Sequence, residues 1–404
     1  MFTTRYKRFI QLRSVLAISL FMSVCLVMVA RAEEPPPEDT PIQIYIPLVV
    51  GSNGNGDTGD LVATKVVSLA EQKATLAFWT RKATAAAQPM EMPSQLDSAE
   101  VDVAALSEPA ATGVRGFVAA GAAAPGAVLA AKAAYPLDWA AAEENLEETV
   151  EAAALLAPDG TSQIYTSYIV NQATALQTLY PHVWVGRLSF RLPNGDTNYC
   201  SGTSINGNVM LTAAHCLYNS TTNVWHSNWA FTPAYRDGNA PYGTFPATQC
   251  WVLTAWINLT GNYNTNTWAR HDVGVCKMGT NSAGTTLNNA VGWMGREWNA
   301  SYTRHAHDLG YPFKNYNDVF ITDAGKYLRT CVAETFQQTT ETRGLGCNHG
   351  GGISGGPWMI GYAPGVVSGQ ATSVNSGIFI GTQNMYGARF NSNNIVPLCT
   401  AAGC

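Results

Sequence analysis

Residues 200–218, CSGTSINGNVMLTAAHCLY, contain the pattern that decides the fold. The apolar run VML at 209–211 reads as a strand, and small residues separate it from His215, which Cys216 follows. Such packing fixes an imidazole ring at the end of a strand while one edge of the ring stays open. Taken alone, however, a histidine beside a cysteine is as consistent with a structural residue as with a catalytic one.

The chain around this stretch, from about residue 165 onward, is rich in Gly, Asn, Thr, Tyr and Trp. Short runs of alternating character, such as HVWVGRLSF at 182–190 and GIFIGTQN at 377–384, are separated by turn signals such as PNGD, INGN and RDGN. Many short strands without long helices between them predict an all-β barrel or sandwich.

Asp272 is a second candidate, in the stretch WARHDVGVCKM at 268–278. It directly precedes a strand-like apolar run. An aspartate that enters a β-core must be paired, for example with an imidazole N–H, because an isolated buried charge is costly. The fragment is equally consistent with an aspartate at a strand edge that faces water.

Ser354 is a third candidate, in the glycine-rich loop GGGISGGPW at 350–358. For acyl transfer, backbone N–H groups at and before the nucleophile must point at the developing oxyanion, and glycine lets the backbone take that shape. Gly352 and Ser354 supply candidate donors of this kind. The alternative is a flexible turn that happens to contain a serine.

TAAHC, Asp272 and GxSGGP, in the chain order His, Asp, Ser, together resemble the chymotrypsin-like serine proteases. CSGT paired with AAHC, and DLGYP at 308–312, bring the resemblance nearer the bacterial branch that includes the glutamyl endopeptidases. It covers roughly residues 180–404. The resemblance implies an all-β fold of two six-stranded Greek-key β-barrels.

The same resemblance implies a role for each candidate. Ser354 is the nucleophile, His215 is the general base and later the general acid, and Asp272 orients and stabilises the imidazolium. The N–H groups of Gly352 and Ser354 form the oxyanion hole. Substrates are expected to be proteins or peptides, and no cofactor and no metal is expected.

Two positions depart from the digestive members of this family. Ile353 stands where those enzymes carry the aspartate that pairs with the freed amino terminus, so activation by that ion pair is not expected. Asn348 stands where trypsin-like enzymes carry the acid that binds Arg or Lys, so a basic P1 preference is not supported.

By similarity, the wall of the primary substrate pocket is the stretch TSVNSG at 372–377. Asn348, Ser373 and Asn375 are the predicted substrate-binding residues, because their amide and hydroxyl groups suit a polar or acidic P1 side chain. His349 adds a positive charge there or is an exposed loop histidine. A glutamate preference is therefore a hypothesis.

Nine cysteines are present, and Cys25 lies in the export signal described below. The other eight are expected to form disulfides, since export leads to an oxidising compartment. The resemblance implies the pairs Cys200–Cys216 and Cys331–Cys347. Two further pairs then follow, Cys250–Cys276 and Cys399–Cys404.

The amino-terminal part has a different character. Basic residues precede the apolar run at 14–30, and a small-x-small cleavage signal ends it, which predicts a secretory signal peptide over residues 1–32. An uncleaved membrane anchor is the alternative. A Pro/Gly-rich linker follows over 33–60, and its segment IQIYIPLVVG is a candidate strand. Residues 61–170 are expected to form an Ala-rich, acidic pro-region or spacer, and residues 171–404 the protease domain.

The pro-region is expected to be partly helical, with its clearest helix starting near Asp138 in DWAAAEENLEETVEAAALL. No Lys or Arg lies between Lys132 and Arg187, so we expect maturation between about residues 140 and 180 after a non-basic residue. The acidic pro-region and the mildly basic protease domain are opposite in charge. This suits a pro-region that assists folding or inhibits the enzyme. Alternatively, the charges of each part merely solvate its own surface.

The sequence thus predicts a secreted, extracellular serine endopeptidase made as a precursor, with no membrane association after signal removal. No Lys/Arg cluster indicates a nucleic-acid partner, and a monomer is expected. A catalytically silent, protease-like binding protein is the alternative. RHAHD at 304–308 also has the HxH start of binuclear metal hydrolases, but only His349 follows it, so a loop before GYP is the plainer account.

Overall fold

The computed structural model of the chain describes residues 61–95, 113–125, 151–156, 162–170, 176–260, 268–315, 321, 323–379 and 383–404. The predicted signal peptide, the linker with its candidate strand and residues 138–150 of the predicted helix lie outside these residues. In the part that is described, no helix is both long enough and apolar enough to cross a bilayer.

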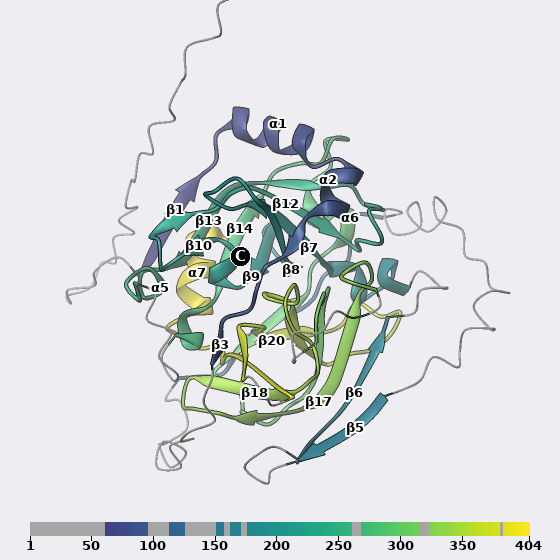
Figure 1. Cartoon of the computed structure of the whole chain (residues 1–404), viewed down its shortest axis with the longest axis vertical. Helices are drawn as coiled ribbons and strands as arrows, with labels where there is room; N and C mark the ends of the chain where they lie inside the picture. The colour runs from purple at the N-terminus through teal and green to yellow at the C-terminus, as the bar shows by residue number, and fades with distance from the viewer. Residues whose placement is uncertain are drawn as a thin grey trace, which may run out of the picture. The chain divides into compact units, whose positions relative to one another are not determined.

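The first sheet closes into an antiparallel barrel (Figure 1). β7 pairs with β8 and β12, β9 pairs with β8 and β14, and β13 pairs with β12 and β14, so the ring of six strands has no free edge between its members. The strands are β7 (Val185–Arg191), β8 (Thr197–Ile205), β9 (Val209–Thr212), β12 (Ser227–Pro233), β13 (Phe245–Leu253) and β14 (Gly274–Met278).

Turn chemistry explains the sharp connection between β8 and β9. Gly207 and Asn208 have φ of 76° and 59°, a left-handed conformation that glycine and asparagine adopt at low cost. The INGN turn signal is therefore confirmed. Leu188 and Phe190 on β7 and Leu211 on β9 are fully buried and belong to the apolar core of this barrel.

Six strands of the larger second sheet follow one another in the order β20, β19, β16, β17, β18, β22. The two ends of this run meet, because the N–H of Ser376 donates to Tyr386 O (3.1 Å) and that of Phe390 donates to Thr372 O (3.4 Å). The predicted all-β architecture of two rolled sheets is therefore confirmed. The strands are β16 (His305–Gly310), β17 (Arg329–Gln337), β18 (Thr342–Gly346), β19 (Pro357–Ile360), β20 (Gln370–Val374) and β22 (Asn384–Ala388).

The amino-terminal region adds strands to both sheets. In the first sheet, β1 (Val62–Val66) pairs with β13 and β2 (Gln88–Pro89) with β8. In the second, β3 (Ser94–Gln95) pairs with β21 (Gly377–Phe379) and β4 (Gly116–Val118) with β15 (Gly295–Trp298).

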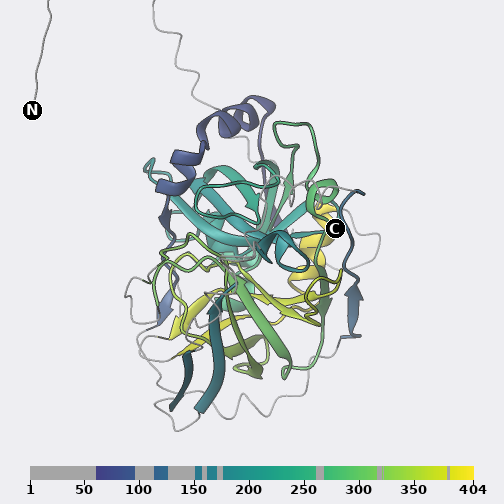
Figure 2. The same cartoon turned by 90° about the vertical axis from the view of Figure 1, so that its right-hand side faces the viewer.

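Two helices connect β1 to β2, namely α1 (Leu69–Phe78) and α2 (Arg81–Ala86). Ser68 and Glu71 form a capping box that starts α1. Figures 1 and 2 both show these helices over the first barrel and away from the second sheet, in agreement with the contacts of α1 with β12 and β13.

The helix predicted from Asp138 to residue 156 is wrong over its last six residues. Glu151–Leu156 form the strand β5, which pairs with β6 (Ser162–Ile169), and β6 in turn pairs with β17. Alanine and leucine are among the best helix formers, but the preference is worth less than about 1 kcal/mol per residue, and the hydrogen bonds offered by a neighbouring strand override it. β6 lies within the stretch assigned to the pro-region, yet it extends the second sheet.

The four predicted disulfides are confirmed: Cys200–Cys216, Cys250–Cys276, Cys331–Cys347 and Cys399–Cys404. The first ties β8 to the turn that contains His215. The second crosses between the paired strands β13 and β14. The last closes the end of α7 (Ile395–Ala402), which packs on the same two strands.

Candidate active site

His215 and Asp272 form a buried pair at one end of the first barrel. The Nδ1 of His215 lies 2.7 Å from Oδ2 of Asp272, and the backbone N–H of His215 donates to Oδ1 at 2.8 Å. Both side chains are almost completely buried. The carboxylate thus fixes the ring at two points and favours the tautomer with a proton on Nδ1, which leaves Nε2 able to accept a proton.

Strand pairing brings these two residues together. β9 and β14 are neighbours, with Thr212 opposite Gly274. His215 follows the end of β9 in a short 3-10 turn, and Asp272 precedes the start of β14. Residues at adjacent strand ends lie close in space, so the strand-end placement predicted for both side chains is confirmed. The alternative of an Asp272 that faces water is not, because its side chain is buried.

The loop with Ser354 comes from the second sheet and presses against the first barrel. Ser201 on β8 donates its N–H to Ser354 O (2.7 Å) and its Oγ to Gly352 O (3.0 Å). Gly355 has φ of 78°, and a Cβ there would lie 2.0 Å from Oγ1 of Thr212. Only glycine therefore lets the loop approach the strand that leads to His215.

Two atoms of the candidate catalytic residues have no hydrogen-bond partner among the described residues. They are Nε2 of His215 and Oγ of Ser354, and both are buried. No other described group engages either atom, so a histidine nitrogen and a serine oxygen in neighbouring loops are both available for proton transfer.

Gly352, one of the two predicted oxyanion donors, already has an acceptor. Its φ is 92°, and its N–H donates to the carbonyl oxygen of Met90 at 3.0 Å. Met90 lies in the amino-terminal region, so a part of the chain outside the predicted protease domain reaches this loop. No sequence motif predicts that contact.

Ser376 is another residue that the sequence reasoning missed. Its Oγ donates to the carbonyl oxygen of Asp272 at 3.5 Å, and it is fully buried. It therefore links the end of β20 to the residue that orients His215. Its place within TSVNSG, the predicted pocket wall, was the available signal.

The three predicted substrate-binding residues have different surroundings. Asn348 is partly exposed beside the Cys331–Cys347 disulfide. Ser373 and Asn375 are fully buried. Ser373 donates to Ala388 O, while Asn375 accepts from the Trp358 indole N–H at 2.7 Å and donates to Asp308. The polar groups of the latter two thus stabilise the interior of the second sheet, and a substrate role for the three stays a prediction.

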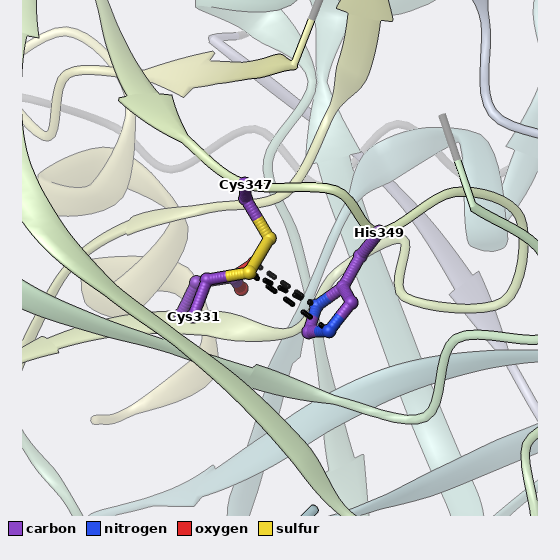
Figure 3. A group of neighbouring side chains, drawn as sticks. Cys331, Cys347 and His349 are labelled. Carbon is purple, nitrogen blue, oxygen red and sulfur yellow. Dashed lines mark hydrogen bonds and ion pairs between the residues drawn. A yellow bond between two sulfur atoms is a disulfide. The ribbon is translucent and has the colours of Figure 1, made fainter. Parts of the chain in front are cut away.

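His349 belongs to a buried polar cluster rather than to an exposed loop. Its ring lies against the Cys331–Cys347 disulfide (Figure 3), with Nδ1 3.7 Å from Sγ of Cys331. Its Nε2 lies 3.2 Å from Oγ of Ser167, and its Nδ1 lies 3.8 Å from Asp308. Burial lowers the pKa of His349 and raises that of Asp308, because both lose hydration as charged groups.

The HxH residues do not converge with Asp308. The rings of His305 and His307 are 5.8 Å apart, and His307 stacks on Tyr362, whereas Asp308 bonds with Asn375 on the other face of β16. Alternation along a strand separates neighbouring side chains in this way. The prediction of a loop before GYP is wrong, because His305–Gly310 form the strand β16 through pairing with β17 and β19.

The arrangement is now complete: a closed six-stranded barrel, a second rolled sheet, a histidine–aspartate pair from the first and a glycine-framed serine from the second. The fold is chymotrypsin-like. The resemblance that TAAHC and GxSGGP predict is confirmed at this level.

The chain is similar in sequence to a bacterial protein of described activity. No known family profile matches the chain. It is 28% identical over 212 residues to a protein described as an extracellular metalloprotease of Bacillus subtilis (strain 168). The match covers 52% of the chain and 59% of that relative, so the chain spans about three-fifths of the relative's length.

Solved structures similar to the chymotrypsin-like chain include three proteases. Protease Anisep from Arthrobacter nicotinovorans has a TM-score of 0.47 and 30% identity, over 55% of this chain and 95% of its own. The thermostable serine protease AL20 from an extremophilic microorganism has a TM-score of 0.45 and 24% identity, over 55% and 97%. A Glu endopeptidase has a TM-score of 0.46 and 19% identity, over 59% and 97%.

Proposed function

We propose that the chain is a secreted serine endopeptidase, made as a precursor, that cleaves peptide bonds through an acyl-enzyme. One observation carries the proposal. His215 is fixed by the buried carboxylate of Asp272 through Nδ1, and its Nε2 and the Ser354 Oγ are both among the buried side-chain atoms without a hydrogen-bond partner in the described part of the chain. That pattern suits a general base beside a nucleophile.

The chemistry follows from these atoms. As Ser354 Oγ forms a bond with the peptide carbonyl carbon, its proton passes to Nε2 of His215, and the carbonyl electron pair moves onto oxygen. The N–H groups of Gly352 and Ser354 would stabilise that oxyanion. Collapse breaks the C–N bond, and the amine leaves with the proton from Nε2. Water then repeats the sequence and frees the acid and Ser354.

Features outside the triad support a serine pathway and export. The four proteins similar to this chain are described as proteases, one of them as extracellular. One of them is also called a metalloprotease. Within the described residues, however, the sulfurs in both clusters with metal-ligating atom types are bonded to other sulfurs, so those sulfurs are not available as thiolate ligands.

The experiment is active-site labelling of the purified chain with a fluorophosphonate, beside the Ser354→Ala variant. We expect one adduct by intact mass, absent in the variant, and hydrolysis of a casein or peptide substrate that is lost in parallel. A folded, released protein that is never labelled would instead support the rival function of a protease-like binding protein.

A further inference from the structure

A segment of the amino-terminal region, residues 88–95, lies across the candidate active site. It follows α2, and in Figure 1 the blue trace from α2 to β3 crosses between the first barrel and the second sheet. At its start, Gln88 and Pro89 pair in parallel with Asn198 and Tyr199 of β8. The side-chain amide of Asn198 also donates to Pro89 O at 3.3 Å.

The middle of segment 88–95 holds the nucleophile loop. The N–H of Met90 donates to Tyr199 O at 2.8 Å, and its carbonyl oxygen accepts the Gly352 N–H at 3.0 Å. Glu91 forms an ion pair with Lys314 at 2.9 Å. A peptide carbonyl therefore occupies the donor that an oxyanion would need.

The end of segment 88–95 runs beside β21. Met92 is 7% exposed and belongs to the apolar cluster that contains Ile353. A Cβ on Gly377 would lie 2.7 Å from Pro93 O, so the two backbones are in close contact. β3 then pairs with β21, directly after Ser376, which contacts Asp272.

These contacts are typical of a peptide bound in a groove, and they are not expected of a spacer that lies away from the site. Segment 88–95 uses backbone hydrogen bonds on both sides, one buried side chain in the middle and one ion pair. Extended peptides are recognised in this way, because main-chain pairing supplies affinity and a pocket supplies specificity. The groove between β8, the Ser354 loop and β21 is thus built to hold an extended peptide.

We propose that segment 88–95 is an intramolecular occupant of the substrate groove and slows the reaction of Ser354 in the uncleaved chain. This inference rests on the proposed serine endopeptidase function. The segment is anchored before by α2 and after by β4, which pairs with β15. Because of these anchors, a single cut in the chain after residue 125 does not remove segment 88–95. Activation therefore requires the release of this segment from the groove.

The test compares three full-length chains, each with a matched Ser354→Ala control. Met92→Glu places an acid in a buried apolar site and should free segment 88–95. Leu69→Glu makes the same kind of change on α1, where the side chain is 64% exposed and away from the groove. We expect Met92→Glu to react with a fluorophosphonate at least tenfold faster than wild type, and Leu69→Glu to match wild type.

A second measurement does not depend on how Met92→Glu folds. The synthetic peptide AQPMEMPSQ, residues 87–95, is added to the Met92→Glu chain or to any labelled form, and a scrambled peptide serves as the control. We expect the native-order peptide to slow labelling competitively, with the scrambled one inactive. A melting temperature measured for each variant confirms that the compared chains are folded.

The outcomes separate the two proposals. Equal labelling rates in wild type and Met92→Glu, with no competition by the peptide, overturn the inhibitory role and leave the serine endopeptidase function intact. Absence of Ser354-dependent labelling in every folded variant overturns the proposed function itself. Faster labelling in Met92→Glu, or competition by the peptide alone, supports the inference.

Discussion

Asp272 contacts His215 twice, through the ring and through the backbone. A side chain with two carboxylate oxygens can do this, because each oxygen accepts from a different N–H of the same residue. The two hydrogen bonds fix the pair before any substrate binds, so in the proposed mechanism the cost of orienting the base does not arise at the moment of reaction.

The first prediction concerns this pair. Asp272→Asn should lower kcat on a peptide substrate by roughly 10³–10⁴-fold, since an amide N–H₂ cannot accept from Nδ1–H and would favour the wrong imidazole tautomer. Circular dichroism should show an unchanged fold. The rate would be measured on chain from which the amino-terminal inhibition has been relieved. A loss of less than tenfold would contradict the orienting role of Asp272.

His226 is a second residue whose environment has a measurable effect. It is 1% exposed, its Nε2 lies 3.2 Å from His215 O, and its ring stacks on Phe190. Burial lowers its pKa to about 4, against an ordinary 6.5, and the hydrogen bond to His215 only partly offsets that effect. His226 is thus neutral in the folded chain at pH 7.

The pH dependence of stability follows from the sign of this shift. Between pH 6.5 and 4, His226 is protonated in the unfolded chain and neutral in the folded chain. Its contribution to the free energy of unfolding is therefore fully present above pH 6.5 and is lost as pH falls toward 4. His226 alone contributes a loss of about 3 kcal/mol by pH 4. His226→Gln, which does not titrate, should flatten the slope in urea unfolding across this range. An unchanged slope would contradict the assignment.

At the scale of elements, the serine loop and strand β9 depend on one glycine contact. Gly355→Ala forces a Cβ to 2.0 Å from Thr212, whereas Gly365→Ala meets nothing within 4 Å at a nearly equal φ of 76°. Both substitutions carry the backbone strain of a left-handed alanine, about 1–2 kcal/mol. Only the first should displace the loop.

The second glycine therefore serves as the matched control. Gly355→Ala should lower kcat/KM by roughly 10²-fold or more, because a shift of about 1 Å in a nucleophile has that effect. Gly365→Ala should lose a similar amount of thermal stability and keep its activity. Equal activities in the two variants would show that the loop tolerates displacement.

The local elements around the site were predictable from the sequence, and the distant ones were not. The His215 turn, the Ser354 loop and the INGN hairpin are encoded by residues adjacent in the chain, such as Gly207 and Gly355, whose special geometry limits the alternatives. The strand β5 was read as a helix because its pairing with β6 is a tertiary contact. The packing of the amino-terminal strands depends on partners far along the chain, which local periodicity cannot reveal.

The burial of the predicted pocket residues illustrates the same limit. Asn375 and Ser373 suit a polar pocket by residue type, yet their hydrogen bonds to Asp308, Trp358 and Ala388 lie within the second sheet. Residue type alone does not tell which face of a strand a side chain occupies when both faces are buried.

At the scale of the whole chain, the amino-terminal region and the two barrels share sheets. β1 has five residues in register with β13, and three further short pairings follow with β8, β21 and β15. The indole N–H of Trp79 donates to Asn228 O, and its side chain is buried against the first barrel. Strand pairing and side-chain packing therefore hold the amino-terminal region to the rest of the described chain, which a loose linker would not show.

A nicked chain should therefore stay together. If the chain is cut between residues 126 and 150, we expect the two fragments to elute as one species by size exclusion in native buffer and to separate in 6 M guanidinium, an ordinary denaturing concentration. The uncut chain in both buffers is the control. Fragments that separate spontaneously in native buffer would show that the paired strands contribute little to association.

The pairing of β1 with β13 also implies an order in which parts of the chain fold. Thr64 bonds to Cys250, a partner 186 positions further along the chain. During synthesis or export, the first described strand therefore has no partner until more than half of the protein has emerged. Contacts of such long separation form slowly, since a large loop must close first. The amino-terminal strand is accordingly among the last parts of the chain to fold, although it is among the first to be made.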